Sequence, residues 1–388
     1  MLLSRTDRSY FSEWWWTVDR LALVTCVILM VVGLVLSLAA SPAVATKIGV
    51  DEMFFVKKQL KFMPIALFLM LSISFISSER FLRYIALILF IGGAVLMVVA
   101  IVSGASIKGS NRWLSLGFMT LQPSEMVKPG FVVLSAWLFA QGIKYPGVKG
   151  AWLAFGLFVT FASLLILQPD MGQTVLVAAV WFCLFILSGA PLWIFAALAG
   201  VFAAGSVIAY NTMSHVASRI DRFLDPESGD TYQVDMALQS FMQGGWFGKG
   251  PGESSVKALL PDAHTDFVFA VVGEEFGIIG CLLIIAVYVL MIFSFLRHAF
   301  VIEEMFKKLA ITGLTVMFGL QAFINMGVNL NILPAKGMTL PFISSGGSSL
   351  LSMAITIGLL LALTRRRPQV GRLPVGGRFH ASSSIQGA

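Results

Sequence analysis

The chain has 388 residues, of which 57% are hydrophobic and 12% are charged, and its formal net charge is +7. A soluble domain carries about twice that share of charged residues, so the composition excludes an ordinary soluble protein and predicts a polytopic membrane protein. Membrane topology explains the positive charge better than nucleic-acid binding does, and no nucleic-acid partner is predicted.

Apolar stretches of about 20 residues, the length that crosses a bilayer as a helix, recur along the chain. Ten of them predict an all-α polytopic membrane protein with ten transmembrane helices. They lie near residues 21–40, 60–78, 82–103, 125–141, 151–168, 172–189, 191–210, 267–296, 309–330 and 342–363. An even number places both termini on one side, and the larger number of Lys and Arg in the loops of that side predicts that it is cytoplasmic.

These spans divide the chain into three parts. We expect a cytoplasmic N-terminal segment at residues 1–20, one membrane domain at 21–364 and a short basic cytoplasmic tail at 365–388. The longest hydrophilic stretch, about 211–265, is predicted to be an extracytoplasmic loop between helices 7 and 8. All three cysteines fall within apolar spans, so neither a disulfide framework nor a metal cluster is expected.

The first long outer loop, about residues 104–124, leads into the fourth predicted helix. Pro123 suits a first helical position, and Glu125 and Lys128 share one face of that helix and can pair. One interpretation is an internal ion pair that neutralises both charges in the bilayer. The other is a cation directed at a lipid phosphate, together with Arg112 upstream. The sequence favours neither.

The second outer loop has local signals of its own. Its run Asp225–Asp230 contains Pro, Ser and Gly and is typical of a turn. Residues 234–242 then have apolar side chains at helical spacing. The glycines between residues 244 and 252 are expected to interrupt any regular structure.

The segment Leu259–Gly280 places a charged loop directly before an apolar helix. Asp266, at the junction, is either a helix N-cap or a functional carboxylate at the outer interface. At 100° per residue, a strip of small residues lies within about 40° of Asp266 and would let another helix or a lipid chain approach closely. The strip consists of Ala270, Gly273, Gly277 and Gly280. A carboxylate above such a strip suits a reaction on a lipid-anchored substrate.

Glu274 and Glu275 follow within the same helix. Glu274 lies about 80° around the helix from Asp266 and Glu275 lies nearly opposite, so at least one of them faces a neighbouring helix. Ionisable groups at membrane depth are costly and usually mark a site. For both glutamates, a buried and hydrogen-bonded structural role is favoured.

The ninth span carries a polar stripe, because Gln321, Asn325 and Asn329 are each four residues apart. Such amides need partners, either on another helix or across a hydrated cavity. The prolines, glycines and serines of residues 333–349 then predict irregular backbone at membrane depth, which is tolerated only when it is buried or lines a cavity. Together these features predict a membrane site for an anionic, lipid-linked substrate.

Several motifs, in order along nearly the whole chain, resemble the SEDS family (shape, elongation, division and sporulation proteins). The most specific are Leu260-Pro261 with His264-Thr265-Asp266-Phe267, Gly273-Glu274-Glu275 and Lys336-Gly337-Met338-Thr339-Leu340-Pro341-Phe342. The others are Asn111-Arg112-Trp113, Gln122-Pro123-Ser124-Glu125, Gln168-Pro169-Asp170 and Gln239-Ser240 with the glycine-rich run 244–250. Gly273, and Lys336-Gly337 with Thr339, resemble the cell-division branch more than the elongation branch. Ser345 departs from the pattern, since many relatives have Tyr there.

The resemblance implies ten helices with cytoplasmic termini and a peptidoglycan glycosyltransferase that polymerises lipid II at the outer leaflet during septal cell-wall synthesis. It also implies that Asp266 is the essential acidic residue of the family. The implied partners are lipid II, a class B penicillin-binding protein that supplies transpeptidation, and other divisome membrane proteins. No cofactor follows from the motifs, although a divalent cation, Mg²⁺ or Mn²⁺, would supply countercharge for the diphosphate.

Our hypothesis makes Asp266 a general base that takes a proton from a sugar hydroxyl of lipid II. The predicted substrate-binding residues are Arg112, Trp113, Gln122, Glu125, Lys128, Gln239, Ser240, Lys249, His264, Thr265, Lys336, Ser344, Gly346, Gly347 and Ser348. The alternatives are a flippase that moves lipid II across the membrane, a septal scaffold, and an elongation-specific polymerase of the same family. The outward position of Asp266 and the absence of paired broken helices favour the polymerase over the flippase.

Overall fold

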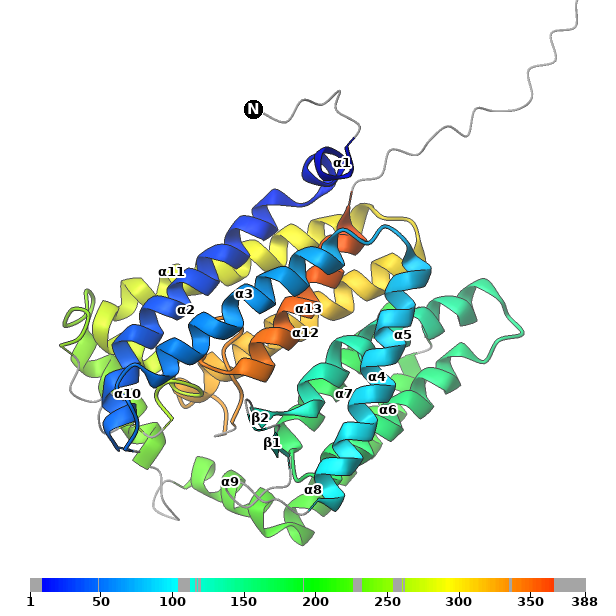
Figure 1. Ribbon diagram of the computed structural model, residues 1–388. Helices are drawn as coiled ribbons and strands as arrows, with labels where there is room; N and C mark the ends of the chain where they lie inside the picture. The colour runs from blue at the N-terminus through cyan, green and yellow to red at the C-terminus, as the bar shows by residue number, and fades with distance from the viewer. Residues whose placement is uncertain are drawn as a thin grey trace, which may run out of the picture.

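The computed structural model describes residues 9–47, 49–103, 112–115, 117, 120–190, 192–225, 232–253, 260, 262–334 and 337–365. Within these ranges a helix of at least 17 residues overlaps each of the ten predicted spans (Figure 1). The helices are α2 (Arg20–Lys47), α3 (Phe54–Ser74), α4 (Glu79–Val102), α5 (Pro123–Lys144), α6 (Gly150–Leu167), α7 (Met171–Leu187), α8 (Leu192–Thr212), α11 (Val268–Val301), α12 (Met305–Asn329) and α13 (Gly347–Thr364). Seven of them, α2, α4, α5, α6, α11, α12 and α13, are long and apolar enough to cross a membrane. A mostly helical, multi-pass membrane protein is therefore confirmed, and crossings by α3, α7 and α8 stay predictions.

Shorter elements connect these helices. They are α1 (Tyr10–Thr17), α9 (Ser214–Leu224), α10 (Tyr232–Gly244) and an antiparallel hairpin of β1 (Leu114–Ser115) and β2 (Thr120–Leu121). Helix α10 includes the residues with helical spacing in the second outer loop, whereas α9 and the hairpin were not predicted. The hairpin does not change the mostly helical class, and strands of two residues are too short to show an alternating pattern in the sequence.

Helix α13 lies inside the bundle, and its side chains are buried along almost its whole length because they are apolar on all sides. Gly358 allows close packing against α3, since an added Cβ would lie 2.9 Å from the carbonyl oxygen of Met70. The predicted start of the tenth span at residue 342 was wrong. Phe342 has left-handed backbone (φ 64°), which ends any helix there, and α13 begins only at Gly347.

Arg365 joins three parts of the chain at one end of the bundle. Its guanidinium donates hydrogen bonds to Oγ1 of Thr17, the last residue of α1, at 3.0 Å and to Oγ of Ser77 at 3.0 Å. A third bond, at 3.1 Å, goes to the carbonyl of Phe75 after α3. The beginning of α1 and the end of α13 therefore lie at the same end of the helix bundle (Figure 1).

Helix α11 is broken in its interior at Gly277, where the backbone has φ 66° and ψ −166°. The break leaves the carbonyls of the preceding turn without their usual partners in the helix. The N–H of Lys249 donates to the carbonyl of Glu274 at 3.0 Å. The N–H of Gly250 donates to the carbonyl of Glu275 at 3.1 Å. The glycine-rich turn after α10 thus replaces part of the hydrogen-bonding pattern of α11.

The same turn also accepts hydrogen bonds from the other side of the break. Ile278 donates its N–H to the carbonyl of Gly245 at 2.9 Å, and Ile279 donates to that of Trp246 at 3.3 Å. Gly248 is required at this contact, because an added Cβ would lie 2.1 Å from the carbonyl oxygen of Glu275 and its own φ is 80°. We call the two paired segments, residues 244–250 and 274–279, the backbone interlock.

Helix α10 covers the strip of small residues that follows Asp266. A Cβ on Gly273 would lie 2.2 Å from Cδ1 of Phe241, and one on Gly244 would lie 1.8 Å from the carbonyl oxygen of Gly273. The strip was predicted from the geometry of a regular helix, and the break at Gly277 ends that regular helix. Of the two predicted neighbours of the strip, a helix or a lipid chain, the structure shows a helix, α10. The prediction of a lipid chain along the strip was wrong, because α10 occupies that space.

We expect Gly277→Ala to lower the thermal unfolding midpoint of the purified protein by several degrees. The new Cβ would meet the carbonyl of Trp246 at 2.5 Å, and left-handed backbone in a non-glycine residue costs about 1–3 kcal/mol. Gly92→Ala in α4 is the matched control, because nothing lies within 4 Å of a Cβ built there. Equal midpoints for the two variants would contradict the described contact.

Candidate active site

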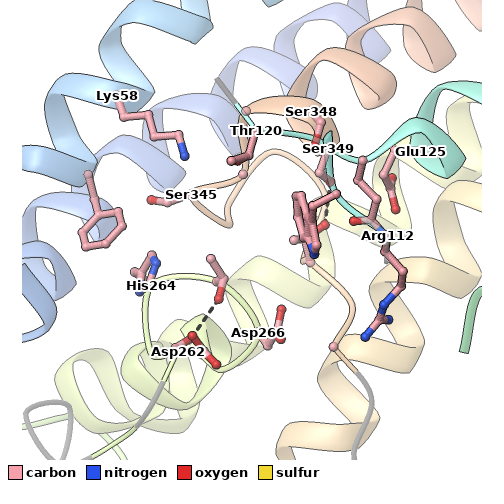
Figure 2. Close-up of a pocket in the computed structure, with 18 of the residues that line it drawn as sticks. Lys58, Arg112, Thr120, Glu125, Asp262, His264, Asp266, Ser345, Ser348 and Ser349 are labelled. Carbon is pink, nitrogen blue, oxygen red and sulfur yellow. Dashed lines mark hydrogen bonds between the residues drawn. The ribbon is translucent and has the colours of Figure 1, made fainter. Parts of the chain in front are cut away.

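A cavity of about 350 Å³ lies at the start of α3, the end of that helix away from Arg365. Side chains from distant parts of the chain meet around it, and Figure 2 shows the loop before α11 on one side and the start of α13 on the other. The lining residues are Phe55, Lys58, Arg112, Trp113, Thr120, Gln122, Glu125, Gln173, Asp262, His264, Thr265, Asp266, Gly337, Thr339, Ser345, Gly346, Gly347, Ser348 and Ser349.

Asp266 belongs to a tight turn that precedes α11. The carbonyl of Asp262 accepts hydrogen bonds from the N–H groups of Thr265 (3.0 Å) and Asp266 (3.1 Å). Asp262 itself has left-handed backbone (φ 54°), a conformation that Asp tolerates better than most residues. Because this turn delays the first helical residue to Val268, the N-cap is Phe267, and the interpretation of Asp266 as N-cap was wrong. The half-buried Asp266 side chain lines the cavity instead.

Two amides of α12 hold the main chain of Asp266. The Nδ2 groups of Asn325 and Asn329 donate to its carbonyl oxygen at 2.8 and 2.9 Å. Asn329 also accepts the N–H of Ala270 through Oδ1 at 3.1 Å, so it joins the loop and the first turn of α11. Both amides are buried and their partners lie on neighbouring segments of the protein. They fix the backbone from which the carboxylate extends.

The segment before α13 holds the same loop from the opposite side. Ser345 donates its N–H to the carbonyl of His264 at 2.9 Å, and Oγ of Ser344 donates to the carbonyl of Thr265 at 2.5 Å. Gly337 lies directly against the carboxylate, because a Cβ added to it would be 3.1 Å from Oδ2 of Asp266. The loop is therefore clamped between α12 and this segment, and Ser344 lies behind it rather than in the cavity.

Helix α3 forms one wall of the cavity. The ring of Phe55 packs on the imidazole of His264 with 3.9 Å between centroids. Lys58, one turn further along α3, also lines the cavity, and in Figure 2 it lies on the other side of the opening from Arg112. Lys58 was not predicted as a site residue, because the direction of its side chain depends on how α3 packs against its neighbours.

Arg112 is oriented by Asp170, the N-cap residue of α7. Its Nη1 lies 3.3 Å from Oδ2 of Asp170, and Nε2 of Gln122 approaches the same oxygen at 3.4 Å. The Arg112 side chain is 22% exposed and the Asp170 side chain 6%. A buried carboxylate thus aligns a cation and an amide along the edge of the cavity.

Lys128 lies behind the cavity wall and is completely buried. Its ammonium contacts Glu125 at 2.9 Å, Gln173 Oε1 at 3.1 Å and Gln321 Oε1 at 2.7 Å. Three partners use all three ammonium N–H donors, so Lys128 has none left for a lipid phosphate. The internal ion pair is therefore the interpretation that the structure supports.

The predicted residues of α10 and α11 form a separate cluster outside the cavity. Lys249 lies 3.4 Å from Oε1 of the buried Glu274, and Oε1 of the buried Glu275 accepts the N–H of Gly252 at 3.3 Å. Gln239 and Ser240 lie on α10 and do not line the cavity, and the Ser240 hydroxyl donates to the carbonyl of Met236. The contacts of Lys249 with Glu274 and of Gly252 with Glu275 add to the backbone interlock. Lys336 and Asn111 lie outside the described residues.

The cavity includes polar residues that were not predicted as site residues. Thr120, Gln173, Asp262, Thr339, Ser345 and Ser349 all line it. Oγ1 of Thr339 and Oγ of Ser349 lie 2.5 Å apart across the segment that leads into α13. Among the described residues, no three His, Cys, Asp or Glu side chains are clustered closely enough to hold a metal ion.

Comparison with known proteins gives one consistent family. A family model described as a cell cycle protein, FtsW/RodA/SpoVE, matches residues 19–369. The chain is 41% identical to a probable peptidoglycan glycosyltransferase FtsW of Caulobacter vibrioides, over 97% of this chain and 96% of that protein. It is 37% identical to the protein of the same name in Saccharophagus degradans, over 90% and 92% of the two chains.

Solved structures show the same architecture. One similar chain belongs to a peptidoglycan synthase complex that coordinates polymerization and crosslinking, with a TM-score of 0.73, 25% identity and coverage of 89% of this chain and 97% of that one. The rod shape determining protein RodA of Thermus thermophilus is similar with a TM-score of 0.66 and 25% identity, over 90% and 98% of the chains. These similarities agree with the resemblance carried by the motifs.

We expect Lys128→Met to destabilise the protein strongly, because it leaves the buried Glu125 carboxylate without its cation. Removing one partner of a buried ion pair costs about 3–5 kcal/mol. The double variant Glu125→Gln with Lys128→Met carries no buried charge, and should recover much of the thermal unfolding midpoint. A single variant as stable as the native protein, or a double variant no more stable than the single one, would refute this role of the pair.

Proposed function

Since the chain belongs to the FtsW/RodA/SpoVE family of cell cycle proteins, we propose that it is a peptidoglycan glycosyltransferase that polymerises lipid II into glycan strands. Two relatives, 41% and 37% identical to this chain over nearly their whole length, are named probable peptidoglycan glycosyltransferases. The single observation that supports the proposal most is Asp266, a half-buried carboxylate held by its backbone in a cavity with cations on two sides. This is the arrangement that base-assisted transfer from a diphosphate-linked sugar requires.

We propose that ten helices cross the membrane, that both termini are cytoplasmic and that the cavity opens at the outer face. The residues 1–20, 21–364 and 365–388 then form the N-terminal segment, the membrane domain and the tail, with the loop of about 211–265 outside. Arg365 supports this topology, because it brings the two ends of the described chain to the end of the bundle away from the cavity. An outer-face site would receive lipid II from the leaflet in which strands grow.

In the proposed reaction, Asp266 acts as general base. Its carboxylate accepts the proton of the GlcNAc 4-hydroxyl of an incoming lipid II, and that oxygen attacks the anomeric carbon of the MurNAc at the end of the growing strand. The new glycosidic bond forms with inversion as the bond to the diphosphate breaks, and undecaprenyl diphosphate leaves with the electron pair. Aspartate is ionised at neutral pH, as this role requires.

The leaving diphosphate needs positive charge, and we assign that role to Arg112 and Lys58. Both line the cavity, and Asp170 holds Arg112 in place at 3.3 Å. The serines and glycines at residues 345–349, with the first N–H groups of α13, would provide further donors to phosphate oxygens. The proposed substrate-binding set thus keeps Arg112, Trp113, Gln122, Glu125, His264, Thr265 and the glycines and serines at 346–348.

A partner that crosslinks the strands is part of the proposal. One structurally similar chain comes from a complex described as coordinating polymerization and crosslinking. A class B penicillin-binding protein would supply transpeptidation to the strands made here, and other divisome proteins would place the pair at the septum of the cytoplasmic membrane. The FtsW name of the relatives supports the division role over an elongation role.

The first test is polymerisation of labelled lipid II by the purified protein, together with a penicillin-binding partner whose transpeptidase has been disabled. Asp266→Asn should lower the rate by about 10²–10⁴, the usual contribution of a general base. Asp51→Asn is the matched control, because Asp51 is an exposed aspartate that contacts Lys57 away from the cavity. Its loss should leave polymerisation unchanged.

Near-native polymerisation by Asp266→Asn would exclude the general-base role. A native protein that makes no polymer but moves labelled lipid II between the leaflets of vesicles would support a flippase instead. If the native protein and the Asp51 control make polymer and the Asp266 variant does not, both the flippase and the scaffold are excluded as the main function.

A second prediction concerns the positioning of Asp266. Asn329→Ala removes one donor to the Asp266 carbonyl. It also removes one of the two acceptors of the Ala270 N–H, which keeps only the carbonyl of Phe267 at 3.1 Å. We expect kcat to fall about tenfold, because small displacements of a reacting group are costly, while KM changes less than about twofold. Asn211→Ala is the control, since that amide is exposed on α8 and, among the described residues, bonds only the carbonyl of Val207. A rise in KM with unchanged kcat would instead indicate a role in substrate binding.

A further inference from the structure

Two adjoining hollows lie at the end of α5 away from the Asp266 cavity. Each has a volume of about 360 Å³, and Arg83 and Trp137 line both of them. They are enclosed by the start of α4, the end of α5 and the start of α12. The cavity at Asp266 contains Glu125 from the first turn of α5, so the two sites are separated by nearly the full length of that helix.

Three cations surround these hollows, and no acid among the described residues pairs with them. Arg80 and Arg83 come from the first turns of α4, and Lys144 is the last residue of α5. The acids nearby, Glu79 and Glu304, both contact Lys307, at 2.6 and 2.7 Å. The local charge is therefore positive and available to an anion.

Arg83 is held in a fixed orientation. Its guanidinium lies 5.6 Å from the ring centroid of Trp137 and 5.5 Å from that of Phe306. Its Nε donates to the carbonyl of Glu79 at 3.3 Å. Across the described ranges, no hydrogen bond or ion pair involves its two terminal nitrogens. Such a planar, oriented guanidinium suits the oxygens of a phosphate.

An exposed apolar surface continues from the cations along α4. At 100° per residue, Tyr84, Leu87 and Ile91 all lie within about 40° of Arg80 around that helix. Tyr84 is 55% exposed, Leu87 41% and Ile91 53%, and all are on a helix apolar enough to cross a membrane. One helix face thus presents a cation, then an aromatic side chain, then an aliphatic surface. This order matches the headgroup, interface and hydrocarbon layers of a bilayer leaflet.

We propose that this surface is a binding site for an anionic phospholipid of the leaflet at the α1 end of the bundle. The lipid phosphate contacts Arg80 and Arg83 with Lys144 nearby, and one acyl chain lies along Leu87 and Ile91. The glycerol region occupies the hollow beside Trp137. The site is independent of the polymerase proposal, because it lies at the other end of α5 and shares no residue with the Asp266 cavity.

The continuous apolar surface favours a lipid over a soluble phosphate compound. A soluble anion would use only the cations and leave the aliphatic face of α4 in contact with bulk lipid. An anionic lipid uses both, and basic residues near a membrane surface each strengthen its binding by about fivefold.

The test is native mass spectrometry of the full-length protein in detergent, titrated with palmitoyl-oleoyl phosphatidylglycerol or with the matching phosphatidylcholine. We expect the native protein to bind phosphatidylglycerol at least about tenfold more tightly. Arg80→Gln alone should weaken that binding about fivefold, and Arg80→Gln with Arg83→Gln should abolish the preference. Arg80 is exposed, so we expect its replacement to leave the fold intact.

The matched control is Lys149→Gln with Lys308→Gln, which removes two charges at the same end of the bundle but outside both hollows. This control should keep the preference for phosphatidylglycerol, and an equal loss there would reduce the proposal to nonspecific charge. Leu87→Asn should weaken both lipids, as expected if an acyl chain lies along α4. The lipid assignment would be overturned by two results together: 20 mM inorganic phosphate displaces phosphatidylglycerol, and it does so equally well from the Leu87→Asn variant and the native protein. These results would indicate a simple anion site.

Discussion

Within a bilayer, every backbone and side-chain polar group must find its partner inside the protein. This constraint organises the parts of the structure that matter most. At Gly277 the carbonyls and N–H groups released by the broken helix are bonded by the glycine-rich turn after α10. Around Lys128 one ammonium is shared by a carboxylate and two amides from three other positions. At Asp266 the main-chain carbonyl accepts two asparagine amides.

The same constraint explains how a carboxylate can be exposed to a cavity yet firmly placed. The loop that carries Asp266 receives hydrogen bonds from α12 on one side and from Ser344 and Ser345 on the other. Its side chain lines the cavity. Irregular backbone can occur here because side chains and main-chain groups of neighbouring elements bond its N–H and carbonyl groups. In a helix, those groups would bond to one another. Rigid support of a reacting group lowers the cost of reaching the transition state.

Much of the fold could be predicted from sequence, because length and apolarity decide which segments can be membrane helices. The site was predicted in part. Asp266, His264 and the 346–348 segment were identified through motifs, and they do line one cavity. The choice between two roles for Lys128 could not be made, because it depends on Gln173 and Gln321, which lie 45 and 193 residues away. Lys58 was missed for a related reason, since the direction in which a helical residue points is set by packing between helices.

The backbone interlock also links the segment between α8 and α11 to the order in which the chain can become stable. Residues 244–250 leave the ribosome before residues 274–279, so the turn is made first and must wait for α11. Until the two segments meet, four main-chain groups of the break have no protein partner, and each would cost several kcal/mol in hydrocarbon. Helix α11 and the region around α10 are therefore expected to reach their final depth together, as one unit of assembly. Residues 244–250, which lie between α8 and α11 in the chain, are in this sense part of the helix bundle, and a chain without them is expected to leave the break in α11 unsatisfied.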